Sequence, residues 1–100
     1  MTALAVDADP ATVLDCAWQV HPKVAVRPEP FGALLYHFGT RRLSFLKNRT
    51  VVGIVQSLAD HPDARSACAA AGVDETAMPA YARALATLAG SNMIVRREAA

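Results

Sequence analysis

The sequence predicts an α+β domain, in which a three-stranded antiparallel meander comes first and three helices follow. Two β-prone runs flank a four-residue joint that begins with Gly39, which is the length and chemistry of a hairpin turn. After Lys47 the apolar period changes from about 2 to about 3.6 residues, the change from strand to helix. Strands followed by helices in a chain of 100 residues are typical of one small winged-helix-like domain.

The chain before the meander has a weaker pattern. Residues 1–10 show no period and end in proline, so we expect residues 1–15 to form a flexible arm. The alanine and leucine content of residues 11–20 indicates a short helix that overlaps this arm. Trp18 is the only tryptophan, and we expect it to pack on the sheet or on a partner.

Three short strands make up the predicted meander. Proline cannot donate a hydrogen bond to a ladder, so Pro28 and Pro30 end the first strand. Short turns connect each strand to the next, which makes the pairing antiparallel and leaves the last strand at an edge. The expected strands are Val24–Arg27, Ala33–Phe38 and Arg42–Leu46.

Alternation along the middle strand predicts which of its faces is buried. Leu34, Tyr36 and Phe38 lie on one face, and we expect this large apolar face to look inward. The alternate positions, which include His37, form a mixed face that should look outward. We therefore expect His37 at the surface or at the rim of the sheet.

Periodicity predicts the first two helices. Asn48 or Thr50 can cap the first one, whose apolar residues recur at the spacing of a helix face. Pro62 ends this helix, because proline disfavours helix in the residue before it, and the second helix spans Asp63–Ala71. Gly53 lies inside the first helix, which suggests close packing there. The apolar positions of that helix are Val51, Ile54, Val55, Leu58 and Ala59.

The third helix is expected to start at Asp74 or Thr76 and to end at Gly90. Pro79 fits this helix because it lies within the first turn. Residues 91–95 should pack back as a short extended piece. The apolar stripe of the third helix consists of Met78, Tyr81, Ala82, Leu85, Leu88 and Ala89.

Length and composition favour one folded domain over residues 16–95, with a frayed tail at 96–100. The chain is 53% hydrophobic and its net charge of +1 does not by itself favour a polyanion partner. No apolar run approaches the roughly 18 residues of a membrane span. The N-terminus lacks the pattern of a signal peptide, so we expect a cytoplasmic location.

Residue types that commonly carry catalysis stand apart in this sequence. His21, His37 and His61 are 16 and 24 positions apart, with no cysteine or aspartate at ligand spacing, so no metal site is predicted. The carboxylates lie at helix starts, in loops and in the tails, without a paired arrangement. Cys16 and Cys68 fit no metal or redox spacing. We therefore expect a protein without catalytic activity, metal or cofactor.

The edge strand is the most functional-looking feature. Charged residues at an edge can keep other strands from pairing there. They can also steer an extended acidic peptide, which adds to the edge through backbone hydrogen bonds. Both interpretations fit the pattern. Four cations in nine residues, with no acid among them, bracket the strand: Arg41, Arg42, Lys47 and Arg49.

Two other functions are compatible with a winged-helix-like order of elements. A transcription regulator would place a helix in the major groove of DNA. The second helix offers only Arg65 and the third only Arg83, whereas a DNA reader normally has a basic face on its recognition helix. This count disfavours nucleic acid as a partner. A small dimer that associates through its edge strand is the other alternative.

A family resemblance adds to this interpretation. Residues 18–58, with the closing Gly-Ser-Asn-Met-Ile of residues 90–94, resemble the peptide chaperones of mycofactocin biosynthesis. That family belongs with the PqqD-like recognition elements for ribosomally made, post-translationally modified peptides. The motifs that carry the resemblance are Arg-Pro-x-Pro-Phe-Gly (27–32), Ala-Leu-Leu-Tyr (33–36) and Arg-Arg-Leu-Ser-Phe (41–45).

The resemblance implies a PqqD-like fold and a chaperone that binds the leader of a short acidic precursor peptide ending in Val-Tyr. The leader would lie as an added strand in the groove between the third strand and the third helix. The chaperone would present it to a radical S-adenosylmethionine maturase, which modifies the C-terminal tyrosine. S-adenosylmethionine and iron–sulfur clusters would belong to that partner, and this chain would need no cofactor.

The groove defines a set of candidate peptide-binding residues on two elements. For Leu85 and Leu88 a core position is the stronger interpretation, because an apolar helix stripe usually packs on its own domain. The set comprises Arg41, Arg42, Leu43, Ser44, Phe45, Leu46 and Lys47 on the edge, and Tyr81, Ala84, Leu85 and Leu88 on the helix.

Overall fold

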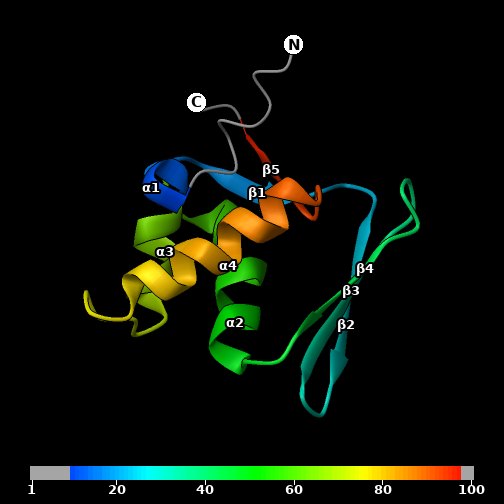
Figure 1. Ribbon diagram of the computed structural model, residues 1–100, viewed down its shortest axis with the longest axis horizontal. Helices are drawn as coiled ribbons and strands as arrows, with labels where there is room; N and C mark the ends of the chain where they lie inside the picture. The colour runs from blue at the N-terminus through cyan, green and yellow to red at the C-terminus, as the bar shows by residue number, and fades with distance from the viewer. Residues whose placement is uncertain (1–9, 98–100) are drawn as a thin grey trace.

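A three-stranded sheet projects from one side of a group of helices in the computed structural model, which describes residues 10–97 (Figure 1). The three strands of this sheet come before the three main helices, and this confirms the predicted α+β class. The elements are α1 (Pro10–Val13), β1 (Trp18–Val20), β2 (Val24–Glu29), β3 (Gly32–His37), β4 (Leu43–Leu46), α2 (Arg49–Ser57), the 3₁₀ helix η2 (Leu58–Asp60), α3 (Ala64–Ala70), α4 (Met78–Gly90) and β5 (Ile94–Arg96).

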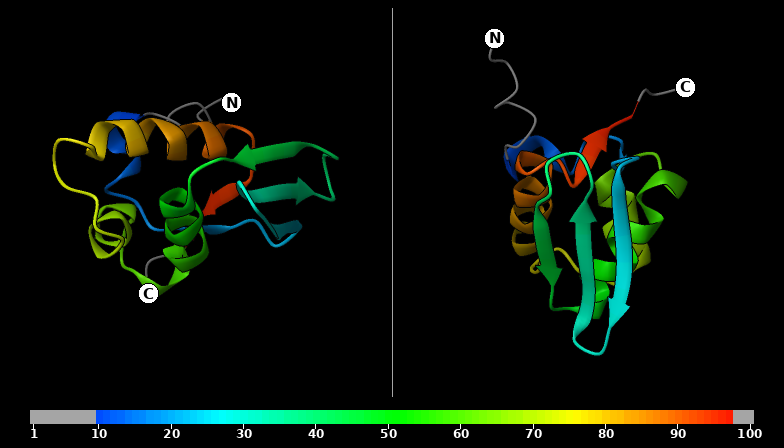
Figure 2. Two further views of the ribbon diagram at one scale, coloured as in Figure 1. Left: turned by 90° about the horizontal axis from the view of Figure 1, so that it is seen from below. Right: turned by 90° about the vertical axis from the view of Figure 1, so that its right-hand side faces the viewer.

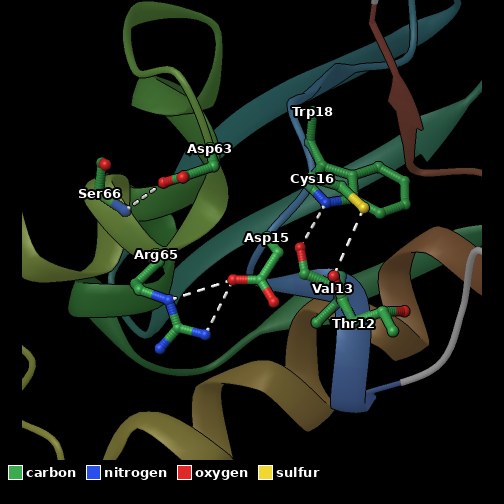
Figure 3. Close-up of polar contacts among 8 residues, drawn as sticks. All are labelled: Thr12, Val13, Asp15, Cys16, Trp18, Asp63, Arg65 and Ser66. Carbon is green, nitrogen blue, oxygen red and sulfur yellow. Dashed lines mark hydrogen bonds and ion pairs between the residues drawn. The ribbon is translucent and has the colours of Figure 1, made fainter.

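The helix predicted over residues 11–20 is wrong in its second half. Only α1 is helical, and Trp18–Val20 forms β1, which pairs antiparallel with β5. The indole Nε1 of Trp18 donates to the Val13 carbonyl at 2.8 Å, and the Trp18 side chain is 1% exposed (Figure 3). Pairing with a strand 76 positions later in the chain decides this structure, and local propensity could not indicate it.

The ends of the described chain are packed more than the sequence predicted. Residues 1–9 of the expected arm lie outside the described residues, but Val13 and Leu14 are buried in the core. At the other end, the guanidinium of Arg97 donates to the carbonyls of Trp18, Leu58 and His61. The expected fraying of residues 96 and 97 is therefore wrong, and residues 98–100 lie outside the described part.

The buried face of β3 is the opposite of the predicted one. Ala33 and Leu35 are fully buried and His37 is 3% exposed, whereas Phe38 is 61% exposed. Both faces of this strand are largely apolar, so alternation alone could not decide between them. Within the buried imidazole of His37, Nδ1 accepts hydrogen bonds from the backbone N–H groups of Gly39 and Thr40, at 3.0 and 3.1 Å, whereas Nε2 has no partner among the described residues.

The helices α2 and α3 begin at side-chain caps, of which the sequence suggested the first. Asn48 Oδ1 accepts from the N–H groups of Thr50 and Val51 at 2.7 and 3.2 Å and starts α2. Asp63 Oδ1 accepts from the Ser66 N–H at 2.8 Å and starts α3 (Figure 3). This hydrogen bond from the Ser66 backbone lowers the pKa of the Asp63 carboxyl.

Three details of the helices differ from the predictions. The helix α4 starts at Met78, because Asp74 caps a separate turn through the Ala77 N–H at 3.0 Å. Ala59 is exposed, although the apolar pattern included it. Gly53 is not closely packed: a Cβ placed there would have no atom within 4 Å.

The segment after α1 attaches α3 to the rest of the fold. The first N–H groups of α3 lack partners within the helix, and the carbonyls of Cys16 and Leu14 accept from Ala64 and Arg65 at 3.0 and 2.9 Å. Arg65 also contacts the Asp15 carboxylate at 3.0 Å (Figure 3). These contacts fix the helical side of the molecule, from which the sheet projects.

Candidate functional site

The strand β4 forms one edge of the sheet, whose strand order is β2-β3-β4. The His37 N–H donates to the Arg42 carbonyl at 2.9 Å, immediately before β4 begins. In an antiparallel ladder, the backbone N–H and C=O groups of every second residue point to the neighbouring strand. Because the backbone of Arg42 points to β3, the backbone groups of Ser44 and Leu46 do so too. Leu43 and Phe45 therefore direct their N–H and C=O groups to the open side, where an added strand can pair with them.

The opposite edge, on β2, lacks such a row of donors. The Phe38 N–H donates to the Lys23 carbonyl at 2.8 Å. By the same alternation, the backbone groups of Val24, Val26 and Pro28 point away from β3. The Val24 N–H already donates to the His21 carbonyl at 2.9 Å, and Pro28 has no N–H. Only Val26 offers an outward donor, so β2 is a poor template for another strand.

A glycine allows β4 to close against β3. Gly32 has a φ of +151°, and a Cβ at this position would lie 2.0 Å from the carbonyl oxygen of Leu46. Only glycine permits that approach without moving β4. Leu46 is 6% exposed and attaches the end of β4 to the core. No local sequence pattern indicates this close contact, because Leu46 is 14 positions away.

The turn before β4 is held by His37. Its ring accepts two backbone hydrogen bonds, and its carbonyl accepts a third from the Arg41 N–H at 2.7 Å. Arg41 has a φ of +63°. The imidazole of His21 lies 4.4 Å from the His37 ring, centroid to centroid. Burial, followed by the charges of His37 and Lys23, lowers the pKa of His21. These contacts fix the direction in which β4 leaves the turn.

In the right-hand view of Figure 2 the helix α4 lies on the side of the sheet where β4 forms the edge. Leu85 and Leu88 are 1% and 5% exposed, so they belong to the core, as the stronger interpretation expected. Tyr81 and Ala84 are half-buried on one flank of the helix. Tyr81 and Ala84 are three positions apart, so their side chains lie on the same flank of the helix.

The seven predicted edge residues form one continuous segment. Leu43 and Phe45 are 53% and 57% exposed and share a face, while Ser44 is half-buried on the other face. The ion pairs within residues 10–97 are Arg27–Glu29 and Arg65–Asp15. The cations around β4 are therefore without an acidic partner in this part of the chain. They are Arg41, Arg42, Lys47 and Arg49, all exposed.

A pocket of about 720 Å³ lies on another flank of α4. Its apolar lining includes Pro10 of α1, Leu14 just after that helix, Ala69 of α3, and Met78 and Pro79 of α4. Asp74 and Glu75 also line it and would repel an acidic peptide. The pocket is therefore distinct from the edge of β4, and its charge does not suit the same ligand.

The residues with potential for catalysis do not form a cluster. Among residues 10–97 no three His, Cys, Asp or Glu side chains lie close enough to hold a metal ion. Cys16 and Cys68 are free thiols, and burial raises the pKa of Cys68. In the same part of the chain, no helix has the length and apolar character needed to cross a membrane.

Comparison with known proteins gives a consistent result. The sequence model of the protein family described as "Peptide chaperone MftB family" matches residues 17–95 of this chain. Proteins named "Peptide chaperone MftB" from Mycobacterium ulcerans and Mycobacterium tuberculosis are each 67% identical, over 85% and 84% of this chain and 78% and 77% of their own lengths. The one from Mycolicibacterium smegmatis is 68% identical over 81% of this chain and 79% of its own length. No solved structure matches the chain.

Proposed function

This chain belongs to the peptide chaperone MftB family, and we propose that it holds the precursor peptide of a mycofactocin-like redox cofactor while a second protein modifies it. It is a chaperone in that biosynthesis and not an enzyme. Identity of 67–68% over four-fifths of the chain or more supports a role like that of the relatives. The observation that carries the binding mode is the open edge of β4.

The leader of the acidic precursor adds to β4 as a further strand. Its backbone pairs with the outward N–H and C=O groups of Leu43 and Phe45. Alternate side chains of the leader turn towards α4, where Tyr81 and Ala84 are half-buried. Backbone pairing and apolar burial supply most of the affinity, because an exposed ion pair contributes only about 0.2–1 kcal/mol.

The exposed cations around β4 speed the encounter with an acidic leader. Arg41 and Arg42 precede the strand, and Lys47 and Arg49 follow it. A radical S-adenosylmethionine maturase receives the held peptide, and it supplies the iron–sulfur clusters and the S-adenosylmethionine. The chaperone's contribution is to hold the leader in an extended conformation at a fixed position, which reduces the ordering cost of the reaction complex.

Titration calorimetry with the synthetic precursor peptide tests this function. We expect saturable binding of one peptide per chain, and no binding of a peptide of the same composition in scrambled order. Absence of binding to the precursor would contradict the proposal. A gel shift with genomic DNA serves as the comparison for a transcription regulator; Arg65, the cation of α3, is engaged by Asp15, so we expect no shift.

A further inference from the structure

The outer face of the sheet is an apolar surface that peptide binding at the edge does not occupy. By register, Leu34 lies opposite Phe45 and Tyr36 opposite Leu43, so these four side chains share one face. Exposed apolar surfaces of this extent are typical of interaction sites. Within residues 10–97, all the large hydrophobic side chains that are exposed belong to this sheet or its turns: Phe31, Phe38, Leu43 and Phe45.

This outer face is preorganised and uncovered. The rings of Tyr36 and Phe38 meet edge to face at 5.0 Å, and those of Phe31 and Phe45 lie 6.1 Å apart. In the right-hand view of Figure 2 the strands lie in front and the helices behind them. Neighbouring strands are about 4.8 Å apart, so β2 lies roughly 10 Å from β4. A peptide added beyond β4 therefore leaves most of the outer face free.

The charges on the outer face identify the kind of occupant. Arg27 of β2 lies on this face by register with Leu34, and its side chain is 75% exposed. Glu29, which lies on the same face by register, pairs with Arg27 at 3.3 Å. The excess positive charge at this face therefore comes from exposed Arg41 and Lys47, at the two ends of β4. Two copies of the chain placed face to face would bring these like charges together, whereas carboxylates on a different protein would neutralise them.

We propose that the outer face of β2–β4 docks a second protein whose contact surface is apolar and bordered by carboxylates. The inference rests on the proposed function, which identifies this protein as the maturase that receives the peptide. A leader strand added to β4 extends the outer face by one strand on the side of Leu43 and Phe45. The docked protein therefore contacts the chaperone and the held peptide at the same time.

The double variant Arg27→Glu, Phe38→Ser tests the docking face, because neither residue belongs to the peptide-binding edge. Binding of the purified maturase, followed by biolayer interferometry, should weaken at least about tenfold, as expected for loss of a central apolar contact and an interface charge. Calorimetric affinity for the precursor peptide should stay unchanged. Arg83→Glu is a matched charge reversal at an exposed position of α4 and should leave both affinities unchanged. Arg27→Glu alone leaves the core intact and should weaken maturase binding in the same direction.

The outcomes separate this inference from the proposed function. If the double variant binds the maturase like the unmodified chain, the docking face is wrong, whatever the result with the peptide. If the double variant loses the peptide, the leader runs across the face and the inference fails. A dimer of the unmodified chain that the variant converts to a monomer would assign the face to a second copy and would also overturn it. If the unmodified chain fails to bind the peptide while the variant loses the maturase, the docking face stands and the proposed function fails.

Discussion

The two edges of the sheet have the same architecture but different chemistry. On β2, the outward N–H of Val24 is already bonded within the chain, and Pro28 has none. On β4, the outward groups of Leu43 and Phe45 are both available. The block on β2 lies in the backbone and disfavours pairing with any strand, whatever its charge. The protection on β4 is only electrostatic, so it repels cationic strands and admits an acidic one.

Proline substitutions at matched outward positions should show this difference most clearly. Phe45→Pro removes an outward N–H of β4 and leaves a carbonyl of the bound peptide without its donor. We expect the affinity for the precursor peptide to fall at least about thirtyfold, which corresponds to about 2 kcal/mol. Val26→Pro removes the outward N–H of β2 and should leave the affinity unchanged. Equal losses in the two variants, measured by calorimetry on folded protein, would show that the edges are equivalent.

The glycines offer a second contrast, in stability. Gly32→Ala places a Cβ against the Leu46 carbonyl at a positive φ, so the free energy of unfolding should fall by roughly 1–3 kcal/mol. Gly53→Ala has open space in the helix α2 and should raise that free energy by roughly 0.5–1 kcal/mol. Chemical denaturation followed by circular dichroism measures both. Similar effects of the two substitutions would mean that β4 does not depend on the close approach at Gly32.

The proposed position of the peptide between β4 and α4 predicts that binding is sensitive to the size of a side chain on α4. Ala84→Leu fills the half-buried flank, so peptide affinity should fall about fivefold to tenfold, the lower end of the roughly 1–3 kcal/mol that overpacking typically costs. Ala80→Leu adds the same volume at an exposed position of the helix and serves as the control. Unchanged affinity of Ala84→Leu would place the peptide away from α4.

The cations near β4 should have the smallest effect, and mainly on the association rate. Raising the ionic strength from about 0.1 M to about 1 M shortens the Debye length from about 10 Å to about 3 Å and should weaken peptide binding. The double variant Arg41→Gln, Lys47→Gln should reduce this salt dependence, with about 0.2–1 kcal/mol lost for each exposed pair. Stopped-flow rates that do not change with salt would remove the steering role from these residues.

Much of the fold could be predicted because its signals are local. The cap at Asn48 and the helical period after Lys47 depend on neighbouring residues only. The strand β1 could not be predicted, because its partner β5 lies at the other end of the chain. The buried face of β3 could not be predicted either, because both of its faces are apolar and the outer one remains exposed.

The candidate site was predictable as a segment but not as a surface. The edge position of β4 follows from the order of strands and turns. The outward direction of the Leu43 and Phe45 backbone groups requires the register set by His37 and Arg42. The role of Gly32 depends on Leu46, a residue 14 positions away, so no local pattern indicates it.

Amide hydrogen exchange, measured by NMR with and without the precursor peptide, tests most directly whether β4 is the edge that receives a strand. We predict that the peptide slows exchange at Leu43 and Phe45 and leaves Val26 unchanged, while Ser44 and Leu46 exchange slowly in both states because they pair with β3. Unchanged exchange at Leu43 and Phe45 under saturating peptide would contradict this account.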